Sequence, residues 1–393
     1  MRIMGKTLRP HQQRFVDKNP NRALLVWETQ TGKTLAACEW LKLRTDRPAL
    51  VLSPKAIIKK WERELADVNA VADVITHDAI KKMDISKYRA IVADECQAFA
   101  SPLFTKQRSQ RATKLYEHIR AHPDTHILLM SATPVRSSAW NIHTLACYLQ
   151  HLWPVKQFRD KFEYLTDIYG RYHYEPVPDW RTKIRPYVKE IADIVLMKDI
   201  IDGDMPEESE EIINIPWTKT HEKAFKDSLA GAYSEPSAEW HARHRAEQGK
   251  DKLAKVKEIT DGYQKAIVVC FYTEQIALYA REIGKERQVF VLQGSTKDQD
   301  AVIEAAKAAD DCVFLIQASM GAGFSASEFN VVIFASMSFR YIDLVQMKGR
   351  VRVITDLHPN MFIYLLAGKC DRAVHERIML GKDFDVHHEL RKA

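Results

Sequence analysis

Short apolar runs recur along the first third of the chain, and each ends in polar or small residues. The runs lie at residues 23–27, 49–52, 71–75, 90–93 and 127–130. Segments with a helical spacing of apolar side chains follow two of them, at residues 35–41 and 57–65. Near-continuous apolar strands that alternate with helices are typical of a parallel sheet covered on both faces. We therefore expect a parallel sheet, with functional side chains at the carboxyl ends of its strands.

A second alternating region begins near residue 265. Its apolar runs lie at residues 266–271, 289–292, 312–316 and 331–334, and a helical pattern covers residues 274–283. Residues 135–262 show helical patterns rather than strands. The sequence thus predicts an α/β protein with a first parallel-sheet lobe at 1–134, a helical insertion and linker at 135–262, and a second lobe at 263–393.

Composition narrows the class of protein. With 393 residues, 46% hydrophobic and 28% charged, the chain resembles a soluble globular protein of two or three domains. We expect no membrane span, because no run of about 18 apolar residues occurs, and no signal peptide. The six cysteines form no C-x-x-C pair, which predicts reduced thiols, a cytoplasmic setting and no zinc site. The net charge of +6 permits a polyanionic partner without proving one.

The first apolar run leads through a polar turn into Gly32-Lys33-Thr34, at the start of a helical pattern. Backbone N–H groups and the helix dipole favour an anion at such a place. Lys33 can reach the β- and γ-phosphates of a nucleotide, and the Thr34 hydroxyl can ligate Mg²⁺. Because Trp27 replaces the first glycine of the usual phosphate loop, an ordinary turn is the alternative.

Two acidic residues follow the apolar run at 90–93. Asp94 would hold Mg²⁺, usually through water, and Glu95 would orient and deprotonate an attacking water. A solvated strand end is the alternative, but the apolar run and the distance from Lys33 favour catalysis. Further upstream, Gln12 is placed either to hydrogen-bond an adenine edge or simply to lie in the first turn of a helix.

The order of the motifs resembles superfamily 2 helicases, and most closely the Swi/Snf-type DNA translocases. The motifs are Leu-Arg-Pro-His-Gln at 8–12, Thr-Gly-Lys-Thr at 31–34, Leu-Ser-Pro-Lys at 52–55, Thr-His-Asp at 76–78, Asp-Glu-Cys-Gln at 94–97, Ser-Ala-Thr-Pro at 131–134 and Gln-Met-Lys-Gly-Arg at 346–350. Gln30 stands where the family usually has Gly, and Cys96-Gln97 replaces Ala-His. Neither departure removes a group needed for hydrolysis.

The resemblance implies two RecA-like lobes that bind ATP and Mg²⁺ between them. Lys33, Asp94, Glu95 and Arg350 would be catalytic, with Thr34 and Asp94 on the metal and Arg350 stabilising charge on the γ-phosphate. The other nucleotide-binding positions would be Arg9, Gln12, Thr29, Gln30, Thr31, Gly32, Gly321, Gly323 and Gln346. The nucleic-acid-binding positions would be Ser53, Lys55, Thr76, His77, Gln293 and Thr296.

A second catalytic arginine is harder to place. The family spacing puts it at position 353, where this chain has Val, and the nearest arginine is Arg352. A shift of one residue turns a side chain by roughly 100° on a helix. Arg350 is therefore the stronger candidate for a catalytic arginine. Arg352 would act as the second one only if the local backbone is shifted.

The resemblance favours a DNA-dependent ATPase that translocates on or remodels duplex DNA, as a compact cytoplasmic motor of a prokaryotic cell or a virus-infected host. Two alternatives stay open. One is a strand-separating or branch-migrating helicase, which needs a separating pin that the sequence does not reveal. The other is an ATP-controlled clamp that acts through a protein partner.

Overall fold

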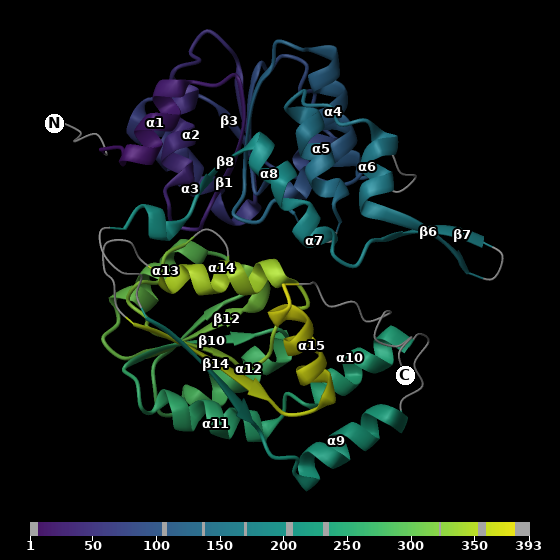
Figure 1. Ribbon diagram of the computed structural model, residues 1–393. Helices are drawn as coiled ribbons and strands as arrows, with labels where there is room; N and C mark the ends of the chain where they lie inside the picture. Colours follow the sequence, from purple (N-terminus) through teal and green to yellow (C-terminus); the bar gives the residue numbers. More distant parts are fainter. Residues whose placement is uncertain are drawn as a thin grey trace, which may run out of the picture. The chain divides into compact units, whose positions relative to one another are not determined.

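The computed structural model describes residues 7–103, 108–135, 138–168, 171–201, 207–230, 236–321, 324–352 and 359–381. Contacts divide the chain into two compact units, Met1–Asp202 and Gly203–Ala393, and each contains a six-stranded sheet (Figure 1). The three-part division expected from the motifs stays a prediction. Within the described ranges, no helix is long and apolar enough to span a bilayer.

The first sheet has the strand order β3-β2-β4-β5-β1-β8, and all neighbouring strands are parallel. Every residue of β2 and β4 is buried, which explains why their sequences show no polar alternation. The strands are β1 (Arg22–Trp27), β2 (Ala49–Ser53), β3 (Asp73–Thr76), β4 (Ala90–Asp94), β5 (His126–Met130) and β8 (Ala192–Val195).

Successive strand residues contribute to two separate cores. Leu25 packs on one face with the helices that flank the turn after β1, whereas Leu24 packs on the other face with later helices. The first group is α1 (Pro10–Lys18), α2 (Lys33–Lys42) and α3 (Ile58–Val68), and the second is α4 (Gln110–Ala121), α5 (Trp140–Tyr148), α6 (Val155–Phe162), α7 (Trp180–Lys183) and α8 (Arg185–Ile191). Figure 1 shows the two groups on opposite sides of the sheet.

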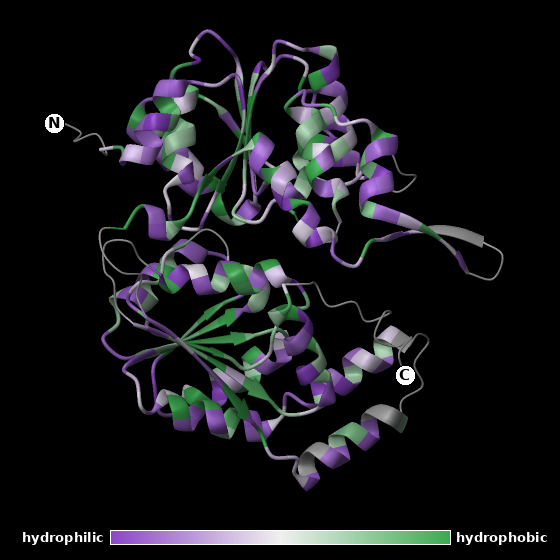
Figure 2. Cartoon of the chain, in the orientation of Figure 1, coloured by the Kyte–Doolittle hydropathy of each residue, from purple (hydrophilic) through white to green (hydrophobic). Residues whose placement is uncertain are grey.

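The second sheet has the order β11-β12-β10-β13-β14-β9 and is also parallel throughout. Figure 2 shows mostly hydrophobic strands in this sheet, among helices that carry both hydrophobic and hydrophilic residues. The strands are β9 (Glu208–Asn214), β10 (Lys265–Cys270), β11 (Val289–Leu292), β12 (Cys312–Gln317), β13 (Val331–Phe334) and β14 (Asn360–Leu366). The helices are α9 (Lys219–Ala230), α10 (Pro236–Ala246), α11 (Lys250–Thr260), α12 (Thr273–Ile283), α13 (Gln299–Ala308), α14 (Tyr341–Val351) and α15 (Lys369–Met379).

The expectation that residues 135–262 lack strands is wrong. This segment contains β8 and β9, each at an edge of its sheet, and an antiparallel hairpin of β6 (Glu163–Ile168) and β7 (Arg171–Pro176). The apolar pattern did not predict β9, because most of its side chains are charged or exposed, as is typical of edge strands. β8 is only four residues long, and Asp193 interrupts its apolar residues.

Candidate functional site

The turn between β1 and α2 wraps around the side chain of Lys33. Its ammonium donates to the carbonyl oxygens of Trp27 at 2.7 Å and Glu28 at 2.8 Å. Gly32, the residue before α2, has a φ of 86°, a left-handed conformation that favours glycine. The first N–H groups of α2 therefore lie beside a lysine ammonium, which is an arrangement that binds phosphate.

Gln12 supports this turn from α1. Its Oε1 accepts the Arg9 N–H at 2.7 Å, and its Nε2 donates to the Gly32 carbonyl at 2.8 Å. A Cβ at Gly32 would lie 2.2 Å from Gln12 Nε2, so a side chain there would displace the Gln12 amide as well as strain the backbone. Both ends of the Gln12 amide thus contact the chain itself, and its predicted contact with adenine stays a prediction.

Trp27, which replaces the first glycine of the usual loop, is a buried anchor. Its indole Nε1 donates to Asp193 Oδ1 at 2.8 Å, and its ring packs edge-on against His11 at 4.9 Å. The next residue, Glu28, accepts the Met197 N–H at 2.6 Å. β8 and the turn after it therefore hold the loop in place. Sequence reasoning missed Asp193 and Glu28, because neither lies in a recognisable motif.

Asp94 lies at the carboxyl end of β4 and is buried. Its Oδ2 accepts the Trp61 indole N–H at 2.9 Å, and its Oδ1 accepts the Glu95 backbone N–H at 2.9 Å. Burial raises the pKa of the Asp94 carboxyl, while the Trp61 hydrogen bond and the positive charges of Lys33 and Lys60 oppose that rise. Lys33 follows β1 and Asp94 ends β4, so both predicted residues lie at the carboxyl edge of the first sheet.

Glu95 follows in a left-handed conformation, with a φ of 48°. Its Oε2 accepts the Gln97 side-chain N–H at 2.6 Å, so the variant residue of the Asp-Glu-Cys-Gln motif orients the carboxylate. Gln97 Oε1 and Thr133 Oγ1 are buried without a hydrogen-bond partner among the described residues. Buried polar atoms of this kind usually bind water or a ligand.

The oxygen groups at this end of the sheet fit a magnesium ion. Mg²⁺ prefers carboxylate, hydroxyl, phosphate and water oxygens. Asp94 supplies a carboxylate, and Thr34 supplies a hydroxyl in the first turn of α2. No group of three or more His, Cys, Asp or Glu side chains with metal-ligand geometry occurs within the described ranges. The pair therefore fits a metal that also takes oxygens from substrate.

The positions predicted to bind nucleic acid in the first unit differ in their surroundings. Ser53 is buried, whereas Lys55 is exposed just after β2. Thr76 Oγ1 accepts the Ala79 N–H at 3.2 Å. His77 Nε2 donates to the Asp94 carbonyl at 2.8 Å, and burial lowers the pKa of its ring. The structure thus brings His77 to Asp94, and Lys55 remains the accessible cation.

In the second unit, Arg350 is buried on α14 and contacts the loop after β12. Its Nε donates to the Gly321 carbonyl at 2.5 Å, and its Nη1 donates to the Phe324 carbonyl at 2.7 Å. A Cβ on Gly321 would lie 3.3 Å from the Met347 backbone N, so this glycine permits close packing on α14. Gln346 is buried on the same helix. Gly323 and position 353 lie outside the described residues.

Arg352 is in a different environment. Its guanidinium forms two hydrogen bonds with the carboxylate of Glu208, at the start of β9, one of them from Nη2 to Oε2 at 2.7 Å. Its side chain is 24% exposed and that of Glu208 is 23% exposed. This pair links the end of α14 to the edge strand, which favours a structural role over a catalytic one.

Gln293 and Thr296 form a tight turn after β11. Thr296 Oγ1 accepts the Gln293 backbone N–H at 3.0 Å, and Gln293 Nε2 donates to Ser295 Oγ at 3.0 Å. Gln317, at the end of β12, accepts the Gly294 N–H at 3.0 Å. The turn lies at the carboxyl edge of the second sheet, as expected.

A family model for the helicase conserved C-terminal domain matches residues 251–353. A curated relative described as an uncharacterized ATP-dependent helicase, YqhH of Bacillus subtilis (strain 168), is 24% identical over 186 residues, covering 39% of this chain and 31% of the relative. This chain is superfamily 2 helicase-like. The helicase-like chain spans about a third of the length of that relative.

Two solved structures were found to be similar to this chain. The Pyrococcus furiosus Hef helicase domain has a TM-score of 0.49 at 14% identity, covering 94% of this chain and 97% of that chain. A variant of S. cerevisiae Dbp5 bound to RNA and ADP BeF3 has a TM-score of 0.52 at 13% identity, covering 94% of this chain and 86% of that chain. The likeness to Dbp5, with the two sheets, confirms the predicted class of two RecA-like parallel-sheet lobes.

Proposed function

We propose that this helicase-like chain is an ATP-dependent nucleic-acid motor and that it translocates on duplex DNA, as the Swi/Snf-type proteins do. The observation that carries the proposal is that the turn around Lys33, after β1, and the buried carboxylate of Asp94, at the end of β4, lie at the carboxyl edge of one parallel sheet. A phosphate-binding lysine beside a carboxylate suited to Mg²⁺ is the arrangement that nucleotide hydrolysis requires.

The residues of the first unit would divide the chemistry among them. Lys33 and the first N–H groups of α2 would bind the phosphates, while Thr34 and Asp94 would hold Mg²⁺. Bound Mg²⁺ would neutralise charge on the phosphate oxygens. Glu95, oriented by Gln97, would position the attacking water and accept its proton.

In the second unit, Arg350 is our candidate for the group that stabilises charge on the γ-phosphate. To act there, its guanidinium would exchange its hydrogen bonds to the Gly321 and Phe324 carbonyls for phosphate oxygens. Lys55 and the turn Gln293–Thr296 are the accessible groups for a nucleic-acid backbone, which predicts binding that depends little on base sequence.

ATP hydrolysis tests this proposal when it is measured alone and with duplex DNA, single-stranded DNA or RNA. Duplex DNA should stimulate turnover most, and Glu95→Gln should lower the stimulated rate by about 10²–10⁴-fold. Glu117→Gln, at an exposed position on α4, is the matched control and should be neutral. Stimulation by no nucleic acid would refute the motor and favour the partner-dependent clamp.

One feature favours a strand-separating helicase as the second candidate. The β6–β7 hairpin carries Leu165 and Tyr174 on one face, directly opposite each other, with exposures of 53% and 54%. Arg159 lies 4.8 Å from the Tyr174 ring. An exposed aromatic side chain beside a cation can stack on an unpaired base. The hairpin is therefore a candidate for the pin that the sequence did not reveal.

Unwinding of a forked duplex tests the hairpin. If it separates strands, Leu165→Ala and Tyr174→Ala should reduce unwinding while leaving nucleic-acid-stimulated ATP hydrolysis intact. Leu152→Ala, an exposed side chain of the same unit outside the hairpin, is the control. Absence of unwinding by the unmodified protein, together with stimulation by duplex DNA, would support the translocase instead.

A further inference from the structure

A pocket of about 480 Å³ lies on the second unit at the carboxyl ends of β9 and β14, far along the sheet from the turn Gln293–Thr296. Its apolar lining includes Ile215, Trp217 and Phe225. The Trp217 ring is 43% exposed and packs edge-on against Phe225 with 5.7 Å between ring centroids. Ligand-binding pockets are commonly of this size and are lined mainly by apolar and aromatic side chains, so this one has room for a large apolar group.

The rim of the pocket is positively charged. Lys369 and Arg372, in the first turn of α15, are both exposed and both line it. Arg372 reaches the end of β9, where its Nη2 donates to Asn214 Oδ1 at 3.4 Å. Within the described part of the chain, neither cation forms an ion pair. Two positive charges therefore face whatever enters.

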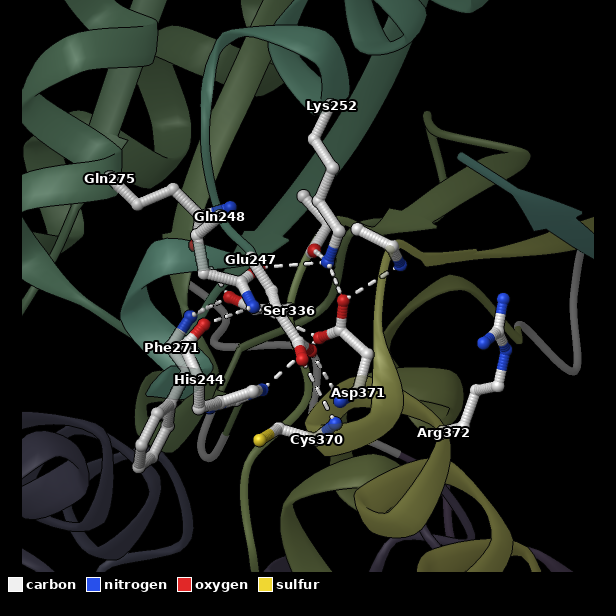
Figure 3. Close-up of polar contacts among 12 residues, drawn as sticks. His244, Glu247, Gln248, Lys252, Phe271, Gln275, Ser336, Cys370, Asp371 and Arg372 are labelled. Carbon is white, nitrogen blue, oxygen red and sulfur yellow. Dashed lines mark hydrogen bonds and ion pairs between the residues drawn. The ribbon is translucent and has the colours of Figure 1, made fainter. Parts of the chain in front are cut away.

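The carboxylate in the lining, that of Glu247, does not neutralise this rim. Glu247 is fully buried, and its two oxygens accept the backbone N–H groups of Cys370 at 3.0 Å and Asp371 at 2.8 Å (Figure 3). The two oxygens thus satisfy backbone N–H groups at the start of α15. Because those N–H groups are already used, an anion at the pocket would bind the rim cations rather than the helix end.

Buried contacts hold the wall of the pocket rigid. A Cβ at Gly368 would lie 2.2 Å from Glu247 Oε1, so the α15 backbone packs directly on that carboxylate. Behind it, Asp371 binds Lys252 and Gln248, whereas Arg372 lies apart from this network (Figure 3). A preformed pocket loses little conformational entropy on binding.

We propose that this pocket binds a short segment of a partner protein in which one large apolar side chain is flanked by acidic residues. The apolar side chain would fill the space beside Trp217, and the carboxylates would pair with Lys369 and Arg372. A nucleic-acid strand fits less well, because the lining beside Trp217 is mainly apolar and offers only Lys369 and Arg372 to a phosphate backbone. The inference is independent of ATP hydrolysis.

Labelled, amidated hexapeptides test the proposal by fluorescence anisotropy with the full chain. The central residue of each peptide is Trp, Leu or Ala. The flanking residues are acidic (Asp and Glu), neutral (Ser and Gln) or basic (Lys and Arg). Acidic peptides with a Trp or Leu centre should bind at least about tenfold more tightly than those with an Ala centre or basic flanks. Equal binding of acidic and basic peptides, or no binding of any, would overturn the proposal.

Variants then locate the binding. Trp217→Ala and Arg372→Glu should each weaken binding of the best acidic peptide about tenfold. Leu380→Ala, at an exposed apolar position, and Arg281→Glu, on α12, are matched controls and should bind normally. Thermal melting checks that all four fold. Unchanged binding of the peptide by both pocket variants would contradict the proposal. So would a single-stranded oligonucleotide that binds the unsubstituted protein but binds neither pocket variant.

Discussion

At the scale of single residues, the candidate nucleotide site depends on contacts that leave little freedom. Gly32 combines a left-handed backbone with close approach of the Gln12 amide, and Asp94 combines burial with a hydrogen bond from Trp61. Each can be altered by a small substitution that leaves the predicted catalytic groups in place. The effects should therefore appear in nucleotide binding or in the pH dependence of turnover.

Gly32→Ala should weaken ATP binding and lower turnover. The added Cβ meets Gln12 Nε2 at 2.2 Å, and an alanine with this φ is strained by about 1–2 kcal/mol. Titration with a fluorescent ATP analogue measures the loss. Gly294→Ala is the control, since a Cβ there would lie 3.7 Å from its nearest neighbour, Gln317 Oε1. Equal nucleotide affinities for the two variants would show that the Gly32 geometry is unimportant.

Trp61→Phe should move the acid limb of the pH–rate profile for ATP hydrolysis to higher pH. Burial raises the pKa of Asp94 and the Trp61 N–H opposes that rise, so removing the N–H raises this pKa further. Since Mg²⁺ binding needs the carboxylate, activity is then lost at a higher pH as the solution is acidified. Trp40→Phe is the control, because this buried indole donates to the Pro20 carbonyl instead. Coincident profiles would contradict the interpretation.

At the scale of elements, buried or paired charges join segments that are distant in sequence. Lys252 on α11 lies 2.7 Å from Asp371 on α15, with side-chain exposures of 0% and 3%. His244 Nε2 on α10 lies 3.1 Å from the other oxygen of Asp371. These contacts hold the helices before β10 against the last described helix, so the second unit should depend strongly on them.

Asp371→Ala should destabilise the second unit by about 3–5 kcal/mol, because it leaves Lys252 buried without its carboxylate. Denaturant unfolding measures the change, and adding Lys252→Met should recover part of it. Burial favours a raised pKa for Asp371, but the charge of Lys252 and the hydrogen bond from His244 outweigh it and hold the pKa below its usual range. The stability that ionised Asp371 contributes to the folded state is therefore fully present above its unfolded-state pKa of about 4, and it is lost as the pH falls below that value. Stability of the variant equal to the parent at neutral pH would contradict this account.

The link between α14 and β9 gives a separate test of Arg352. If Arg352 only pairs with Glu208, Arg352→Ala and Glu208→Ala should lower stability by similar amounts, about 0.5–1 kcal/mol, and should barely change ATP turnover. Arg350→Ala should lower turnover by about 10³-fold or more. A loss of that size in Arg352→Ala, with normal turnover in Glu208→Ala, would restore Arg352 as a second catalytic arginine.

At the scale of the whole molecule, a net charge of +6 and backbone-binding groups at strand ends predict salt-sensitive binding of nucleic acid. The concentration of duplex DNA needed for half-maximal stimulation of ATP hydrolysis should rise steeply with salt, with a logarithmic slope of about 0.9 for each phosphate neutralised. Turnover without DNA should respond much less. A half-maximal concentration that is independent of salt would exclude a phosphate-tracking motor.

Much of the fold follows from local pattern. Buried strands such as β2 and β4 are apolar at nearly every position, so their existence and their parallel pairing were predictable. The edge strands β8 and β9 were not predictable in this way, because a strand that has only one neighbouring strand and exposes its side chains needs no apolar run. In the candidate site, motifs at strand ends identified Lys33 and Asp94. No motif identified Asp193 or Glu28.

The residue order therefore established the two parallel sheets, the helicase-like motif series and the turn around Lys33, since these depend on neighbours within a few positions. Packing across the fold established how the side chains are used. Gln12 supports Gly32, Arg352 pairs with Glu208, and the pocket beside Trp217 forms where β9, α9 and α15 meet. These contacts join residues far apart in the chain, and a distance set by three-dimensional packing leaves no periodic trace in a single sequence.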